Sequence, residues 1–415
     1  MELTEKIVVG RDYSDLEKFG NVCSLYIGKH LVGKGEEAHL TAPLLLDALR
    51  PHVIVICGKR GTGKSYTMGV IAEEIAKLPA KYRENLCALM IDTQGIFWTM
   101  KHESERPELL NAWNLKPRGF KVEVYVPLGQ RETFEKAKVE FDGVFSISPS
   151  QLLLSDWLSV LDLELRSIEA VLLQRALEKL KNRDFSLDEL SEEILRLEGF
   201  EKEKQTLASL IKSMQRWGIF GEARMPNVFE GGKITVLDVS LTPQALRALL
   251  VAIVARKIFE TRSIARREEE LAKIERREIK RVPMIWLLID EAHNFIPCDG
   301  RPASLAPLLR IVREGRQPGI TLVLATQQPN KLHLDALAQC DLIIAHRLTA
   351  KADIEALKTI MQTYIEFDLT KYMDELPRIK GVGIILDDNS ERLYKVQIRP
   401  RQSWHAGASP IAMKV

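Results

Sequence analysis

The sequence has few of the features that mark secreted, disulfide-bonded or membrane-spanning proteins. Only five of its 415 residues are cysteines, and no two of them form a CxxC pair. We therefore expect reduced thiols and no zinc site built on cysteine pairs. The N-terminal stretch carries charges throughout, and nowhere does a membrane-length apolar run occur. A secretory leader and a membrane-spanning helix are thus not expected, and the chain is predicted to be cytoplasmic, without a membrane partner.

The chain also lacks an excess of charge of either sign. Its 59 lysines and arginines nearly balance 57 aspartates and glutamates, and the formal net charge is +2. No overall basic field attracts nucleic acid, so any polyanion must be bound by local patches. Hydrophobic residues make up 46% of the chain, which is enough for a large core. The length predicts either one large domain with an insertion or two domains.

Short apolar runs recur along the chain and alternate with stretches of helical periodicity. An apolar run without a polar face is typical of a strand buried on both sides of a parallel sheet. Strands are expected at residues 53–57, 86–91, 122–126, 234–239, 284–289, 321–325, 342–345, 382–386 and 393–398. Helices are expected at 65–77 and 243–277. The pattern predicts an α/β fold whose mainly parallel sheet is covered by helices on both faces.

The character of the sequence changes in its middle. From about Ser146 to Arg224 the apolar residues follow helical spacing and strand signals vanish. This predicts an all-helical insertion between two parts of the core. A short N-terminal strand-rich segment and a C-terminal part of strands and a tail complete the chain. The expected boundaries are 1–50, 51–142, 143–230, 231–380 and 381–415.

Residues 58–65 read Gly-Lys-Arg-Gly-Thr-Gly-Lys-Ser and fit the pattern G-x-x-x-x-G-K-[ST] in full, directly after an expected buried strand. The glycines let the backbone curl, so that successive N–H groups and the next helix N-terminus bind phosphate oxygens. Lys64 is expected to reach the β- and γ-phosphates of ATP, and the Ser65 hydroxyl to hold Mg²⁺. The residues expected to bind the nucleotide are Gly58, Arg60, Gly61, Thr62, Gly63, Lys64, Ser65 and Tyr66.

A second buried run, residues 284–289, ends in Asp290 and Glu291. Ligands of open α/β sheets bind at the carboxyl ends of the strands. Asp290 is expected to hold the magnesium, and Glu291 to orient and deprotonate the attacking water. Taken alone, two acids after a strand are more often a helix cap, but a phosphate-binding loop in the same chain favours the catalytic interpretation.

Polar side chains also close two other strands. Gln327 follows the run 321–325 and is expected to contact the γ-phosphate, with a simple strand-to-loop transition as the alternative. Asp92 closes the run 86–91, where it either lines the site or caps the next segment.

A basic helix precedes the run 321–325. Arg310 and Arg313 share a face of this helix, and Arg316 follows a glycine at its end, where it can project. An arginine offered to the γ-phosphate of a neighbouring copy would stabilise transition-state charge and make hydrolysis depend on assembly. An ordinary surface arginine is the alternative.

Basic residues that could contact DNA are few. The charged stretch 266–281 alternates in sign, which is typical of a solvated helix end. Loops offer Lys101, His102, Lys331 and His333 to phosphates, although each is also an ordinary surface residue. Without a base-reading motif, sequence-specific recognition is not expected.

Seven blocks together resemble the HerA branch of the HerA/FtsK ATPase superfamily: GKRGTGKS, IDTQG, VLDVS, DEAHNF, VREGRQPGI, ATQQP and QIRPRQSWHAGASP. They occur in the family's order, from about residue 50 to 410. The resemblance implies a RecA-like P-loop core with a helical insertion. It also implies a homohexameric ring that uses ATP and Mg²⁺ to move double-stranded DNA, with a nuclease or another effector as partner.

The resemblance also assigns roles to single residues. Lys64 and Ser65 match the Walker A pair, Asp290 and Glu291 match Walker B, and Gln327 matches the sensor glutamine. The trans-acting arginine of the family falls on Arg316 or, as second choice, Arg313. A C-terminal segment that braces the neighbouring subunit would bring Arg399, Arg401 or His405 close to the neighbour's site.

The sequence departs from the family at three places, one of which is that Gln-Pro-Gly rather than a basic-aromatic pair follows residues 313–316, the R-E-G-R block. Some fifty residues precede the phosphate-binding loop, too few for the family's N-terminal β-barrel, which puts pairing with the nuclease NurA in doubt. Gln328 stands where the family often has arginine after the sensor.

The motifs also bear on other classes of ATPase. DEAH also occurs in two-domain strand-separating helicases, but those need a second RecA-like domain and an S-A-T motif, and ABC-type ATPases need an LSGGQ-like signature. Neither pattern is present. The remaining alternative to a DNA motor is an ATP-gated scaffold that assembles or regulates a nuclease or defence effector without processive DNA movement.

Overall fold

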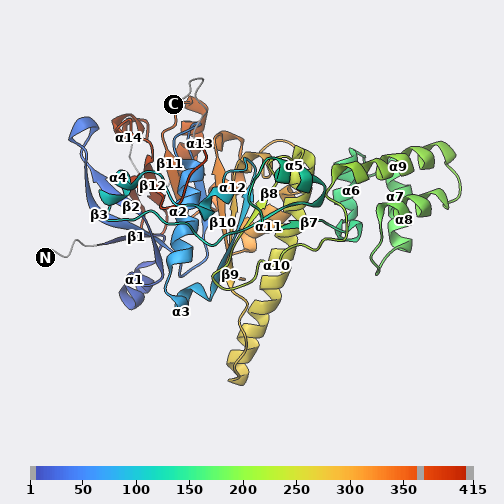
Figure 1. Ribbon diagram of the computed structural model, residues 1–415, viewed down its shortest axis with the longest axis horizontal. Helices are drawn as coiled ribbons and strands as arrows, with labels where there is room; N and C mark the ends of the chain where they lie inside the picture. Colours follow the sequence, from blue (N-terminus) through green and yellow to red (C-terminus); the bar gives the residue numbers. More distant parts are fainter. Residues whose placement is uncertain (1–5, 362–368, 408–415) are drawn as a thin grey trace.

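The chain folds around one large sheet in a computed structural model that describes residues 6–361 and 369–407 (Figure 1). The strands are β1 (Ile7–Val9), β2 (Ser24–Val32), β3 (His39–Asp47), β4 (Val53–Cys57), β5 (Leu86–Asp92), β6 (Glu123–Pro127), β7 (Gly143–Phe145), β8 (Ile234–Asp238), β9 (Met284–Ile289), β10 (Ile320–Thr326), β11 (Leu342–His346), β12 (Val382–Asp387) and β13 (Arg392–Ile398). The helices are α1 (Tyr13–Phe19), α2 (Lys64–Lys77), α3 (Ala80–Arg83), α4 (Pro107–Asn111), α5 (Arg131–Lys136), α6 (Leu154–Leu161), α7 (Ile168–Lys179), α8 (Leu187–Leu195), α9 (Glu201–Ser213), α10 (Gln244–Glu275), α11 (Leu305–Glu314), α12 (Leu334–Ala338), α13 (Lys351–Met361) and α14 (Leu369–Glu375).

The described strands are ordered β1-β3-β2-β13-β12-β11-β4-β10-β9-β5-β8-β6-β7 in the sheet. From β11 to β7 all neighbours are parallel. On the other side, β12, β13, β2 and β3 continue the sheet in antiparallel pairs. The predicted α/β class with a mainly parallel sheet is therefore confirmed.

Burial on both faces explains why the central strands read as continuous apolar runs. In β4, Val53 and Val55 belong to one hydrophobic cluster and Ile54 and Ile56 to another, on the opposite face. Helix α2 contributes to the second cluster, whereas α10 and α11 contribute to the first. Because successive side chains of a strand point to opposite faces, both faces need apolar residues.

The long helical stretch stands beside the sheet. Helices α6 to α9 lie beyond the β7 edge in Figure 1. The 32-residue helix α10 spans about 48 Å and projects past the body of the protein. Residues 143–147 differ from the expected all-helical segment, because β7 pairs with β6 and Ile147 forms a bridge with Phe220. A three-residue strand is too short to give a periodic signal in the sequence.

The N-terminal segment is joined to the sheet rather than folded into a separate barrel. Strands β2 and β3 form a hairpin, and β2 pairs with β13 from the other end of the chain. Parts of the expected first, fourth and last segments, residues 1–5, 362–368 and 408–415, lie outside the described residues.

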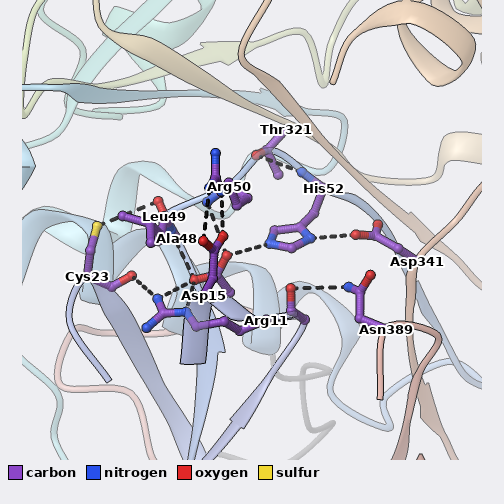
Figure 2. A network of polar contacts seen from close by, with 12 residues as sticks. Arg11, Asp15, Cys23, Ala48, Leu49, Arg50, His52, Thr321, Asp341 and Asn389 are labelled. Carbon is purple, nitrogen blue, oxygen red and sulfur yellow. Dashed lines mark hydrogen bonds and ion pairs between the residues drawn. The ribbon is translucent and has the colours of Figure 1, made fainter. Parts of the chain in front are cut away.

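A buried charged network fixes this N-terminal segment to the core (Figure 2). His52 donates through Nδ1 to Asp341 at 2.5 Å and through Nε2 to Asp47 at 3.1 Å. The guanidinium of Arg11 binds Asp47 from the other side, with Nε 2.8 Å from the carboxylate. Burial alone would lower the pKa of His52, but hydrogen bonds to Asp341 and Asp47 outweigh it and raise the pKa to about 9. The imidazolium therefore bridges two carboxylates that come from distant parts of the chain.

We predict that the free energy of unfolding falls as the pH rises from about 6.5 to about 9, the range set by the pKa of His52. The pKa of His52 is higher in the folded state than the usual value of 6.5. Its contribution is thus fully present below about pH 6.5 and is lost as the pH rises through about 9, a change of about 3 kcal/mol. Urea unfolding at about pH 6, 8 and 10 measures this slope. The variant His52→Gln serves as the control and should be less stable with a flatter profile. An unchanged slope in that variant would exclude His52 as its origin.

Candidate functional site

The carboxyl ends of four neighbouring strands bring the predicted site together. Strands β4, β10, β9 and β5 lie side by side and parallel. Their registers place Cys57, Thr326, Ile289 and Asp92 at the same edge of the sheet. The loops that follow carry the residues predicted to bind phosphate, magnesium and water.

The loop 58–65 connects β4 to α2 and has the backbone of a phosphate-binding loop. Gly58, Gly61 and Gly63 have φ angles of 155°, 77° and 125°, which favour glycine. At Gly58 a Cβ atom would also lie 2.6 Å from the Thr62 hydroxyl. Helix α2 begins at Lys64, so the first N–H groups of the helix have no partner within it. The loop and the helix end therefore offer N–H donors to an anion.

Lys64 lies in this loop with its charge partly shielded from water. Its Nζ donates to the Lys59 carbonyl at 3.2 Å. Burial lowers the pKa of Lys64, and the carboxylates of Glu291 and Asp290 oppose that shift. The side chain is thus positioned between the loop and the two acids.

Asp290 and Ser65, which the sequence predicts to hold Mg²⁺, lie in direct contact. The Ser65 hydroxyl donates to Asp290 Oδ2 at 2.8 Å, and the Glu291 N–H donates to Oδ1 at 2.9 Å. Burial, and then the charge of Glu291, raises the pKa of Asp290 to about 6. A hydroxyl and a carboxylate therefore meet in direct contact beside the phosphate-binding loop.

Glu291 is held by two side-chain amides. Its backbone is left-handed, with φ 49° and ψ 46°, so the side chain turns back over the strand end. Gln327 and Gln94 both donate through Nε2 to Oε1, and the Gln94 distance is 2.9 Å. Oε2 is shielded from solvent and has no hydrogen-bond partner among the described residues. The nearest ring nitrogen, His293 Nδ1, lies 3.6 Å away and contacts Thr326.

A cavity of about 320 Å³ adjoins the loop on the side of Gln327. Its lining residues are Lys59, Arg60, Gln327, Gln328, Leu348, Thr349, Ala350 and Asp353.

Asp92 caps the segment that follows it, which decides between its two sequence interpretations. Its carboxylate accepts the backbone N–H groups of residues 94, 95, 96 and 97. Burial, and then the charge of Asp238, raises the pKa of Asp92 to about 7. Asp92 thus orders the loop from which Gln94 reaches Glu291.

His346 is a site residue that the sequence reasoning missed. It ends β11 beside the phosphate-binding loop, and its Nε2 lies 2.8 Å from the Thr67 hydroxyl. Burial lowers the pKa of His346 to about 4, so the ring is neutral and packs as a structural support. Its only sequence signal is its place at the end of an apolar run.

Arg313 and Arg316 lie at the opposite end of the strands. Arg316 Nη2 is 3.3 Å from Asp341, at the amino end of β11, and Arg313 Nε is 3.0 Å from Asp335. The seven residues of β10 span roughly 20 Å between this end and the phosphate-binding loop. Neither arginine can reach a phosphate bound by the loop of its own chain.

The C-terminal segment is bound to its own chain, which corrects the expectation for Arg399 and Arg401. Arg399 is fully buried and donates to Glu73 of α2 at 2.8 Å. Arg401 is buried beside the same carboxylate and donates to Ser403. Two buried arginines that neutralise a buried glutamate cannot extend to a neighbouring molecule.

Tyr66 and His405 belong to the same contact. The Tyr66 hydroxyl accepts the Arg401 backbone N–H, and the Tyr66 and His405 rings meet edge to face at 5.1 Å. The Tyr66 side chain therefore contacts the C-terminal segment rather than the phosphate-binding loop. Burial lowers the pKa of His405 to about 3, so this ring carries no charge to offer a neighbour's phosphate.

Most of the basic loop residues have partners within the chain. Lys101 pairs with Asp142 at 2.8 Å, and His102 lies 3.3 Å from Glu140. His333 accepts the Asp335 N–H as a helix cap, whereas Lys331 is exposed.

In the described parts of the chain, no helix is long and apolar enough to cross a membrane, and no cluster of three or more metal-ligating side chains occurs.

Comparison with known proteins gives the same fold. VirB4 of Thermoanaerobacter pseudethanolicus superimposes with a TM-score of 0.56 at 14% identity, over 90% of this chain and 97% of that one. The bacterial conjugative coupling protein TrwBdeltaN70 gives a TM-score of 0.51 at 13% identity, over 85% of this chain and 86% of that one. These similarities confirm the expected RecA-like P-loop core.

Sequence relatives give the family. The "Probable DNA double-strand break repair helicase HerA" of Methanocaldococcus jannaschii is 23% identical over 364 residues, in an alignment that covers 78% of this chain and 66% of that protein. The "DNA double-strand break repair helicase HerA" of Pyrococcus furiosus is 28% identical over 139 residues, in an alignment that covers 29% of this chain and 25% of that protein. The chain thus spans less than two thirds of these relatives' lengths. The family model "Helicase HerA, central domain" matches residues 25–258, more than half of the chain. The chain therefore belongs to the HerA helicase family.

Proposed function

We propose that this protein hydrolyses ATP as a hexameric ring and moves double-stranded DNA through it. The observation that carries the proposal is the meeting of the loop 58–65, the Ser65–Asp290 pair and Glu291 at one strand edge. Membership of the HerA helicase family supports the ring and the DNA substrate. A nuclease or other effector is the proposed partner.

The site residues divide the chemistry among them. The loop N–H groups and Lys64 bind the phosphates of ATP. Glu291 orients the attacking water and takes its proton. The Gln327 amide senses the γ-phosphate by moving from Glu291 to that phosphate. Ser65 and Asp290 fit Mg²⁺, because a hydroxyl and one carboxylate leave room for phosphate and water ligands. When bound, Mg²⁺ neutralises charge on the phosphates.

Arg316 is the proposed link between neighbouring subunits. It lies at the opposite end of the strands from its own loop, is largely exposed and is held by Asp341. An arginine in this place can act only on the nucleotide of another copy. Arg313 is the second candidate, with the exposed partner Asp335.

Replacing the acid and the lysine separates hydrolysis from binding. Glu291→Gln should bind ATP normally and lose ATP turnover by about 100-fold or more, because the base is gone. Lys64→Ala should lose binding itself. Binding of a fluorescent ATP analogue and phosphate release measure the two effects. The exposed Lys181→Ala in the helical insertion is the matched control. Normal turnover in Glu291→Gln would contradict the assignment of the base.

Subunit mixing tests the arginine. Arg316→Ala should retain ATP affinity and lose ATP turnover. Mixing inactive Arg316→Ala subunits with inactive Glu291→Ala subunits should restore part of the activity, since some interfaces then combine an intact arginine with an intact base. If neither Arg316→Ala nor Arg313→Ala impairs hydrolysis, neither residue acts in trans.

Duplex DNA distinguishes the motor from the scaffold. For a motor, ATP turnover should rise severalfold with double-stranded DNA, labelled DNA should move, and the native mass with ATP should be that of six copies. A flat response to every nucleic acid would contradict the motor and favour the ATP-gated scaffold that controls an effector.

A further inference from the structure

Glu291 cannot accept a proton from water in the conformation that the structure shows. A carboxylate oxygen offers about two lone pairs in its plane. On Oε1 both are taken by the amides of Gln94 and Gln327. Oε2 has no hydrogen-bond partner among the described residues but is buried, so an attacking water has no accessible oxygen of Glu291 to bind.

The two amides come from different parts of the site, so different movements would remove them from Glu291. Gln327 ends β10 beside the cavity next to the phosphate-binding loop, so a bound γ-phosphate competes for its amide. Gln94 lies in the loop after β5 and is not among the residues that line this cavity. The two restraints on Glu291 therefore come from different strands, which lie on either side of β9 in the sheet.

The Gln94 loop is tied to the C-terminal segment. Asp92 fixes residues 94–97 through their backbone N–H groups. A few residues on, the Thr99 hydroxyl contacts the Trp404 carbonyl at 3.2 Å, and the Ser104 N–H donates to the Gln402 carbonyl at 2.9 Å. The same C-terminal segment is fixed to α2 through Glu73. A shift of that segment or of α2 would move Gln94 relative to Glu291.

We propose that Gln94 is a positioning residue that restrains Glu291 in a non-reactive orientation and keeps basal ATP hydrolysis low. The proposal rests on the assignment of Glu291 as the base. Departure of Gln327 toward a γ-phosphate frees one lone pair of Oε1, but Gln94 still holds that oxygen in place. Movement of the loop that carries Gln94 then lets the carboxylate turn toward the attacking water. The C-terminal segment is the element through which assembly or DNA would act on this loop.

The test replaces the amide by a side chain of similar size that cannot donate. Gln94 is exposed, so Gln94→Met should fold normally. Its kcat for basal ATP hydrolysis should rise on the order of tenfold, the size expected for one lost hydrogen bond to a charged group, with unchanged ATP affinity. Gln94→Asn keeps an amide that is too short to reach Glu291, and it should behave in the same way. Gln130→Met removes a comparable amide that contacts Thr242, and it is the matched control.

The outcomes separate this proposal from the proposed function. A kcat of Gln94→Met equal to or below that of the unmodified protein overturns the restraint, because a residue that helps the base would lower turnover when removed. The double variant Gln94→Met, Glu291→Gln must be inactive, and a rise that persists in it also overturns the restraint. If Glu291→Gln alone keeps full turnover, the proposed function itself fails.

Discussion

The whole site depends on one constraint, namely that parallel strands buried on both faces end at the same edge of the sheet. Strands β4, β10, β9 and β5 come from distant parts of the chain, yet their registers leave a loop, a glutamine, two acids and a capped turn within contact of one another. Hydrophobic burial fixes the strands, and the polar groups can then only lie where the strands stop. The same geometry puts Arg316 at the opposite edge, out of reach of its own loop.

Buried charge is the second organising theme, because each charged group removed from water needs a partner. The His52 imidazolium neutralises two carboxylates where the N-terminal segment meets the core, and Arg399 neutralises Glu73 where the C-terminal segment meets α2. The site is different. There Asp290 is buried with a raised pKa beside Glu291, and Lys64 is the nearby cation. The proposed Mg²⁺ supplies the positive charge that the other two clusters contain already.

The class of fold and the centre of the site could be predicted from the sequence, because both depend on local patterns. Continuous apolar runs identified the central strands, and the spacing of glycines, lysine and serine identified the loop 58–65. Asp290, Glu291 and Gln327 followed as the polar residues at strand ends, and the structure brings them together with the loop.

The rest depends on contacts between distant segments, which no local pattern encodes. Gln94 reaches Glu291 across 197 positions of sequence, and Arg399 reaches Glu73 across 326. Arg399 and Arg401 look exposed in a polar tail, but the structure buries both against one glutamate. Tyr66 directly follows Ser65, yet its position on the helix turns it toward the C-terminal segment. Strand β7 was missed because three residues form no period.

A structure determined with a non-hydrolysable ATP analogue and Mg²⁺ tests the central claim most directly. The account predicts the β- and γ-phosphates within the loop 58–65 beside Lys64, with Mg²⁺ at Ser65 and the Gln327 amide turned from Glu291 to the γ-phosphate. A nucleotide bound away from this strand edge, or no nucleotide bound at saturating concentration, would contradict it.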